Sequence, residues 1–237
     1  MNTVTAQTTN EHSEQTGRVT GFGMNAVMLD VCIILDATGS MSSCIEGVKR
    51  ALQELLKVFS AAAMNAHLGL VVFRDETCHE KPELYAIGTP VGNLQSTLAS
   101  THARGGGDYP ESSLLAIKHA LGLSGYRPDA RRVLFLITDA PPHDPEAGVS
   151  SRDILNLLKT QNVLLFGCTP LIEPYKMLVN ATQGTLFELR SDFGPDAFKD
   201  ITLAFGHKTV KTVRMLDGTD MGSIMREEMR KTMRLDH

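Results

Sequence analysis

The sequence predicts an α/β fold in which a doubly wound sheet carries helices on both faces. Two observations lead to this prediction. Short apolar runs alternate with segments of helical periodicity along the chain. The apolar runs are also nearly continuous, as expected of parallel strands that are covered on both faces. At 237 residues, the chain is long enough for one domain of about 200 residues plus tails.

The first half of the chain supplies three strands and two helices. VMLDVCIIL at 27–35 is apolar and rich in β-branched residues, which predicts a buried strand. A helix is expected at about 43–63, because apolar side chains recur there at helical spacing. HLGLVVF at 67–73 predicts a second buried strand, and LYAIG at 84–88 a shorter one. VGNLQSTLAS at 91–100 predicts a short helix.

The second half continues the alternation. Pro110 suits the first turn of a helix and Glu111 suits the helix dipole, so a helix is expected to begin there. Ser150 or Ser151 is expected to cap a later helix, and Gly184 to end another. The remaining elements are a strand at 131–139, a helix at 151–158, a strand at 162–168, a helix at 174–182, a strand at 185–190 and a helix at 196–205.

Composition excludes several classes of protein. With 23 Lys+Arg against 27 Asp+Glu, the net charge of −4 is too balanced for a nucleic-acid-binding surface. No apolar run approaches the roughly 18 residues of a membrane span. The polar N-terminus does not have the pattern of a signal peptide. The four cysteines form no CxxC pair, so we expect a reduced, cytoplasmic protein.

The two ends of the chain differ from its middle. Residues 1–24 are polar without periodicity, which predicts a disordered tail. The domain is expected at 25–207, followed by a C-terminal tail at 208–237. A helix in this tail would dock on its own domain or offer an adaptable surface to a partner. Its apolar face would consist of Met221, Ile224, Met225, Met229 and Met233.

Oxygen-bearing side chains gather after the expected strands. Asp36, Thr38 and Ser40 directly follow the first strand, within ILDATGSM. Asp108 ends the triple glycine of GGGDYPE, and Asp139 closes VLFLITD. In an open parallel sheet, ligands bind outside the carboxyl ends of the strands. Because hard cations prefer carboxylate and hydroxyl oxygens, the pattern predicts a divalent-cation site, with Mg²⁺ as the first candidate.

Structural alternatives remain open for two of these residues. Ser40 could simply cap the helix after the first strand, and Asp139 could open a turn at Pro141 and Pro142. Phosphate-binding motifs do not fit, because GFGMNA precedes its strand instead of following it and GxxxxGK is absent. A GxSxG nucleophile elbow is also absent. The sequence offers cation ligands and no evident general base.

Together, DATGS after the first strand, the glycine-rich loop and TD after a later strand resemble the von Willebrand factor A (vWA) domain over about residues 28–205. That family's metal-ion-dependent adhesion site (MIDAS) is written Asp-x-Ser/Thr-x-Ser, then Thr, then Asp. FRDE, GGGDYPE and TDAPPH are similar to the subgroup that includes the vWA domains of alpha-kinase and hemicentin-like proteins. The resemblance implies a six-stranded, mostly parallel sheet with one antiparallel edge strand and a metal at its top.

The resemblance also implies a ligand set and a function. Asp36, Thr38 and Ser40 match the first motif and Asp139 the last, whereas Asp108 stands where many members have a loop threonine. The implied ion is Mg²⁺, with Mn²⁺ and Ca²⁺ as alternatives. The implied function is not enzymatic: a partner protein supplies a Glu or Asp that completes the coordination. A carboxylate at Asp108 would strengthen cation binding but leave less positive charge for that acidic ligand.

Two other functions remain open from the sequence. A metal-dependent hydrolase would use the cluster of Asp36, Asp108 and Asp139 to activate water, with His143 as the nearby candidate base. A subunit of an intracellular machine would serve a MoxR-type ATPase or a bacterial stress or conflict complex. In that role the Met-rich helix of the C-terminal tail would be the docking element.

Overall fold

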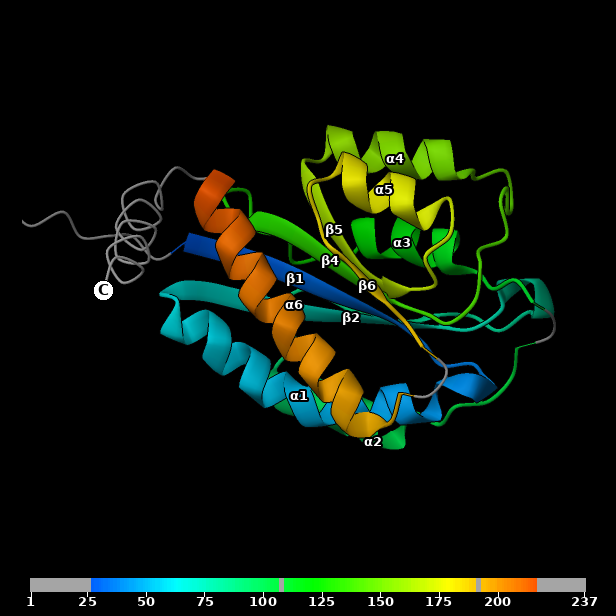
Figure 1. Ribbon diagram of the computed structural model, residues 1–237, viewed down its shortest axis with the longest axis horizontal. Helices are drawn as coiled ribbons and strands as arrows, with labels where there is room; N and C mark the ends of the chain where they lie inside the picture. Colours follow the sequence, from blue (N-terminus) through cyan, green and yellow to red (C-terminus); the bar gives the residue numbers. More distant parts are fainter. Residues whose placement is uncertain (1–26, 107–108, 191–192, 217–237) are drawn as a thin grey trace, which may run out of the picture.

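A six-stranded sheet forms the centre of the protein (Figure 1). The computed structural model describes residues 27–106, 109–190 and 193–216. The strands are β1 (Val27–Asp36), β2 (Met64–Phe73), β3 (Glu83–Tyr85), β4 (Arg131–Ile137), β5 (Val163–Thr169) and β6 (Leu186–Glu188). Their order is β3-β2-β1-β4-β5-β6, with β2 and β3 antiparallel and the other neighbours parallel. The predicted α/β sheet with one antiparallel edge strand is therefore confirmed.

Helices cover both faces of this sheet. Those in the described residues are α1 (Ser42–Ala61), α2 (Val91–Ser100), α3 (Ser113–Leu121), α4 (Ser151–Thr160), α5 (Tyr175–Ala181) and α6 (Pro195–Leu216), with short 3₁₀ helices η1 (Gly39–Met41) and η2 (Glu76–Cys78). Figure 1 shows α1, α2 and α6 on one face and α3, α4 and α5 on the other. The sheet therefore separates two hydrophobic cores.

The two cores explain why the central strands are apolar at successive positions. In β1, Val31, Ile33 and Leu35 pack into the core beneath α1 and α6. Cys32 and Ile34 alternate with them and pack into the core beneath α3, α4 and α5. Since side chains of a strand alternate between the two faces, a strand with helices on both sides needs apolar residues throughout.

Helix α6 is longer than the sequence predicts. It continues to Leu216, so the predicted domain end at 207 falls inside the helix. Phe205 and Val213 are fully buried, and Val210 packs against the same core. The helix continues because its apolar side chains keep facing α1, which lies beside α6 in Figure 1.

Helix α3 begins later than Pro110 predicts. The Glu111 N–H donates to the Pro141 carbonyl oxygen at 2.9 Å, and the His143 N–H donates to the Glu111 carbonyl oxygen at 3.1 Å. These bonds hold the chain at Glu111 against the loop that follows β4. The helix therefore starts at Ser113, and Glu111 is a loop residue instead of a first-turn residue.

Other element boundaries are close to those expected. The last strand residue of β3 is Tyr85, because the Ile87 N–H donates to the Ser124 carbonyl oxygen at 3.0 Å instead of to a strand. Ser150 caps α4 as predicted, and its N–H in turn donates to Asp153 Oδ2 at 2.9 Å. This reciprocal capping box satisfies two backbone groups at the start of the helix.

Parts of the expected organisation lie outside the described residues. These are the predicted disordered tail at 1–24 and the Met-rich face of the C-terminal tail, from Met221 to Met233. Within the part of the chain that the structure describes, no helix is both long and apolar enough to cross a membrane.

Candidate metal centre

Asp36 is held at the carboxyl end of β1 by two threonines. Its Oδ1 accepts hydrogen bonds from the Thr38 N–H at 2.8 Å and from the Thr38 hydroxyl at 2.7 Å. Its Oδ2 accepts one from the Thr138 hydroxyl, also at 2.7 Å. Thr138 directly follows β4, which pairs with β1. The carboxylate orientation therefore depends on the local turn and on the neighbouring strand.

The environment of Asp36 disfavours its negative charge. The residue is 0% exposed, and burial raises the pKa of its carboxyl group. Hydrogen bonds from Thr138 and Thr38 lower that pKa, and the charge of Asp139 raises it again. A cation between the two carboxylates would offset both the burial and the repulsion.

Ser40 and Asp139 line one cavity of about 430 Å³. Ser40 is exposed on η1, whereas Asp139 is half-buried after β4. Helix α1 has Met41 at its N-cap and no side-chain cap bond, so the capping alternative for Ser40 is wrong. Among the described residues, neither the Ser40 hydroxyl nor the Asp139 carboxylate has a protein hydrogen-bond partner. Both can therefore offer oxygen lone pairs to this cavity, and Asp139 acts electrostatically on Asp36.

The glycine-rich loop closes over the same turn. The Arg104 N–H donates to the Ala37 carbonyl oxygen at 3.0 Å, which ties the loop to the residue between Asp36 and Thr38. The Gly106 N–H donates to Glu80 Oε2 at 3.2 Å. Of the predicted ligands, Asp108 lies outside the described residues, so its position relative to Asp36 is not described.

Gly106 lets the loop approach Thr38 closely. Its φ is +80°, in the left-handed region that favours glycine. A Cβ atom at this position would lie 2.9 Å from Glu111 Oε1 and 3.2 Å from Thr38 Cγ2. The loop backbone at Gly106 thus lies close both to Thr38, a candidate cation ligand, and to the carboxylate of Glu111.

Glu111 is a residue of this site that the sequence analysis missed. The side chain is 6% exposed, and its Oε2 has no hydrogen-bond partner in the described part of the chain. Burial raises the pKa of Glu111 to about 8, with further contributions from the charges of Asp36, Asp75, Asp139 and Glu80. The motif GGGDYPE contains Glu111, but in the sequence alone this residue fits the first turn of a helix equally well.

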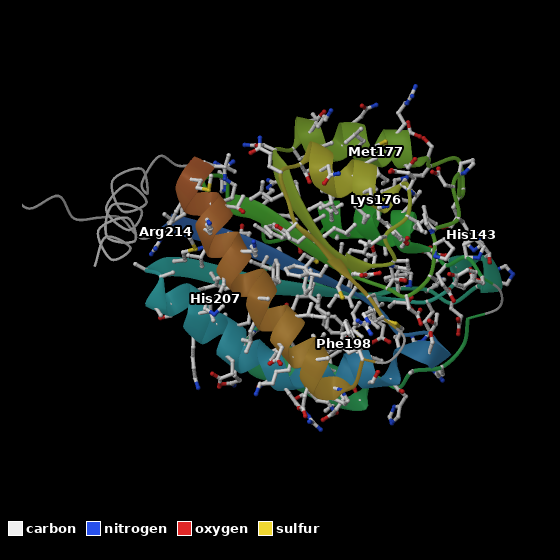
Figure 2. All side chains as sticks on the ribbon, viewed as in Figure 1. His143, Lys176, Met177, Phe198, His207 and Arg214 are labelled. Carbon is white, nitrogen blue, oxygen red and sulfur yellow. The ribbon has the colours of Figure 1, made fainter. Side chains whose placement is uncertain are left out.

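A second polar cluster lies beside the site. The Ser112 hydroxyl donates to Glu146 Oε1 at 2.6 Å and accepts from the Glu76 N–H at 2.7 Å. His143 Nε2 lies 3.7 Å from Asp75 Oδ1. Figure 2 labels His143 on the loop after β4, at the end of the molecule where the strands of the site end. The candidate base of the hydrolase alternative therefore faces Asp75.

Sequence comparison identifies the family of this chain. The family model of the von Willebrand factor A domain matches residues 30–189, which include Asp36, Thr38, Ser40 and Asp139. The chain belongs to the von Willebrand factor A family. This vWA domain is also 24% identical over 119 residues to a protein of Acanthamoeba polyphaga mimivirus described as ariadne-like RING finger protein R811. The match covers 50% of this chain and 12% of the viral protein.

Solved structures agree with the family at the level of the fold. Two crystal forms of proximal thread matrix protein 1 from the mussel byssus match the vWA domain with a TM-score of 0.58 and 14% or 15% identity. The matches cover 78% of this chain and 48% of the mussel protein. The chain therefore spans about half the length of the solved relatives and about an eighth of the viral one.

The donor set of the vWA domain suits a hard cation. Among the described residues, no group of three or more His, Cys, Asp and Glu side chains is arranged to hold a metal ion. The candidate set instead combines two hydroxyls with the carboxylates of Asp36 and Asp139. Mg²⁺ prefers oxygen ligands and usually keeps several waters. The oxygens of Ser40 and Asp139, which line one cavity, and the buried Glu111 Oε2, which has no hydrogen-bond partner among the described residues, fit such a partly hydrated ion.

Proposed function

We propose that this vWA domain is a metal-dependent protein-interaction module. A divalent cation, Mg²⁺ first and Mn²⁺ or Ca²⁺ as alternatives, would be held by Asp36, Thr38, Ser40 and Asp139, directly or through water. The partner would be a protein that offers a Glu or Asp side chain. Membership of the vWA family, whose domains commonly mediate protein interactions, supports the general function. The similarity of GGGDYPE and TDAPPH to the alpha-kinase and hemicentin-like subgroup supports the finer one.

One observation supports the cation above all others: Asp36 is buried next to a second carboxylate without a basic partner in the described residues. Its oxygens accept bonds from the hydroxyls of Thr38 and Thr138, and Asp139 acts on it as a like charge. Taking a carboxylate out of water is costly unless an opposite charge compensates it. A divalent cation would provide that charge and relieve the repulsion.

The residues at this site would have two different roles, orienting the Asp36 carboxylate and offering oxygen ligands. Thr138 and Thr38 fix the direction of the Asp36 carboxylate, and Asp139 and Ser40 offer lone pairs on the exposed side. When bound, a divalent cation would supply an open coordination position for a carboxylate. Without it, the pocket presents negative charge and would repel the same acidic ligand. The cation would therefore control whether the partner binds.

We favour binding over hydrolysis because of the position of His143. A general base must lie within hydrogen-bond reach of the water that it activates. His143 Nε2 lies 3.7 Å from Asp75 Oδ1, in the cluster beneath the loop after β4. At this distance the two atoms make no hydrogen bond, and Nε2 has no hydrogen-bond partner among the described residues. The proximity of His143 to the buried Asp75 carboxylate is what supports a structural role for it.

Thermal unfolding with the metal alone as the ligand tests the proposal. Free Mg²⁺, Mn²⁺ or Ca²⁺ at about 100 times its Kd would add about 2.7 kcal/mol to the free energy of unfolding. Asp36→Asn, which keeps the shape of the side chain, should lose most of this gain. A partner screen with and without chelator, using Asp36→Asn as the control bait, then tests the interaction. Equal stability with each metal and with chelator would refute the proposal.

A further inference from the structure

We propose that Glu111 is an additional carboxylate of the cation site, acting on the ion through one of its coordinated waters. This inference rests on the proposed cation and extends its ligand set with a residue from the loop before α3. It also makes the site more acidic than the motif residues Asp36 and Asp139 alone would.

The first support is a buried oxygen without a partner. Glu111 is 6% exposed, and its Oε2 is fully buried without a hydrogen bond to any described residue. Leaving a buried acceptor unsatisfied costs about 1–3 kcal/mol, and more when the group is charged. Native proteins rarely keep such a group unless a water or an ion completes it.

The second support is the position of the side chain beside a motif residue. The backbone of Gly106 lies between Thr38 and Glu111, so close that a single added Cβ atom would meet both side chains. Glu111 therefore approaches the Asp36–Thr38 turn from the side of the glycine-rich loop. Asp139 approaches the same turn from the carboxyl end of β4.

The backbone of Glu111 is tied to the loop that carries Asp139. Its N–H donates to the Pro141 carbonyl oxygen at 2.9 Å, and its carbonyl oxygen accepts from the His143 N–H at 3.1 Å. Glu111 and Asp139 thus sit on two segments that are joined by hydrogen bonds and a parallel β-bridge from Glu111 to Pro142. This joint fixes the base of the Glu111 side chain relative to the site.

The surrounding charges leave a cation as the missing partner. The carboxylates that act electrostatically on Glu111 belong to Asp36, Asp75, Asp139 and Glu80. The imidazole of His143 contacts Asp75. Because Mg²⁺ keeps several of its waters, a carboxylate at this position can act on the ion through one of them.

Calorimetric titration of the full chain with Mg²⁺, and separately with Mn²⁺, tests this role. Residues that hold a metal ligand or its water typically change metal affinity by about 10–100-fold when mutated. We expect Glu111→Gln to weaken Mg²⁺ binding within that range, and Asp108→Asn to change it less. In chelator, Glu111→Gln should unfold at a higher temperature than the unaltered chain, because its amide cannot ionise and so has no charge that burial beside Asp36 and Asp139 would disfavour. With Mg²⁺ present, the same variant should gain less stability from the ion than the unaltered chain does. A residue with a merely structural role would change stability by the same amount with and without metal.

Three outcomes overturn the proposal. If Glu111→Gln binds Mg²⁺ and Mn²⁺ as tightly as the unaltered chain does, the role of Glu111 is wrong while the cation site stands. A larger loss in Asp108→Asn than in Glu111→Gln returns the position to Asp108. If the unaltered chain binds none of Mg²⁺, Mn²⁺ and Ca²⁺, the proposed function fails together with this inference. Should Glu111→Gln fail to fold, Glu111→Asp, which withdraws the carboxylate by one methylene, carries the same test.

Discussion

The Thr138 hydroxyl donates to Asp36 Oδ2 at 2.7 Å and joins two residues that are 102 positions apart in the chain. The Ala140 N–H donates in turn to the Thr138 hydroxyl oxygen at 3.3 Å, and the Thr138 N–H donates to the Cys168 carbonyl oxygen at 3.2 Å. Thr138 is thereby fixed by the backbone of β5 and of the loop after β4. The candidate cation site exists only when β1, β4 and β5 are assembled.

Thr138→Val should weaken both the fold and cation binding. Valine has nearly the same shape but leaves Asp36 Oδ2 without its donor, which costs about 1–3 kcal/mol for a buried acceptor. Thr209→Val is the matched control, because the Thr209 hydroxyl is buried without a partner in the described residues. Its replacement should be neutral or stabilising. Urea unfolding in chelator and in Mg²⁺ measures both effects; equal losses in the two variants would contradict this role of Thr138.

The sequence predicts the fold well because strands that are buried on both faces appear in it as continuous apolar runs. Val31, Cys32, Ile33, Ile34 and Leu35 are apolar in succession, and no amphipathic strand would require that. The end of α6 is less readable, since its final turns are buried only through contact with α1. The sequence places the start of α3 too early because Pro110 is an ordinary signal for the first turn of a helix. The helix begins only at Ser113, because Glu111 is hydrogen-bonded to the loop after β4.

Some features of the candidate site can be predicted from the sequence and others cannot. The Asp36–Thr38 contact spans two residues and can be read from the motif. Glu111 could not be recognised, because its significance lies in its burial and in the like charges that other segments bring to it. Whether Ser40 caps α1 is decided by η1, which moves the N-cap to Met41. Such a shift of one residue lies below the precision with which a sequence places helix boundaries.

Gly106→Ala should weaken Mg²⁺ binding by more than the strain of its left-handed backbone conformation alone would. A left-handed backbone conformation costs a residue other than glycine roughly 1–2 kcal/mol, and here the added Cβ would also meet Glu111 Oε1 at 2.9 Å. Gly148→Ala is the control: Gly148 has a φ of +75° and no neighbour within 4 Å of an added Cβ. The difference between the two variants in Mg²⁺ affinity reports the contacts of the added Cβ with Glu111 and Thr38. Equal affinities would show that the Gly106–Glu111 contact does not matter for the ion.

The metal-free protein should lose stability as the pH rises. Burial and the charges of Asp36, Asp75, Asp139 and Glu80 raise the pKa of Glu111 from 4.5 to about 8. Below about pH 4.5 the carboxyl is protonated in both the folded and the unfolded state, so the raised pKa costs nothing. Between pH 4.5 and about 8 the unfolded state ionises first, and the free energy of unfolding falls. Above about pH 8 this contribution is constant.

Comparison of Glu111→Gln with the unaltered chain separates the contribution of Glu111 to the pH dependence of stability from that of the other carboxyl groups. The carboxyl groups of Asp36 and Glu146 also lie near this loop, and burial raises the pKa of both in the same direction. The difference in free energy of unfolding between Glu111→Gln and the unaltered chain should therefore grow from about pH 4.5 to 8 in chelator. Denaturant titrations at several pH values measure it, and a difference independent of pH would contradict the assignment.

The extent of α6 predicts which truncations fold. A chain ending at residue 216 keeps the whole helix and should unfold like the full chain if the segment beyond it does not stabilise the domain. A chain ending at 207 loses Val213, which is fully buried against α1, and the bond from Arg214 Nη2 to the Ala62 carbonyl oxygen at 3.0 Å. Burial of one valine is worth about 1.5–3 kcal/mol, so this shorter chain should be clearly less stable.

Both truncated chains should be compared by denaturant unfolding and by Mg²⁺ titration. The site lies at the carboxyl ends of the strands, whereas the last turns of α6 pack beside the C-terminal end of α1, where Arg214 reaches Ala62. Ending the chain at 216 should therefore leave Mg²⁺ affinity unchanged, and ending it at 207 should act through stability alone. Equal stability of the two chains would instead place the domain end at 207, as the sequence alone predicts.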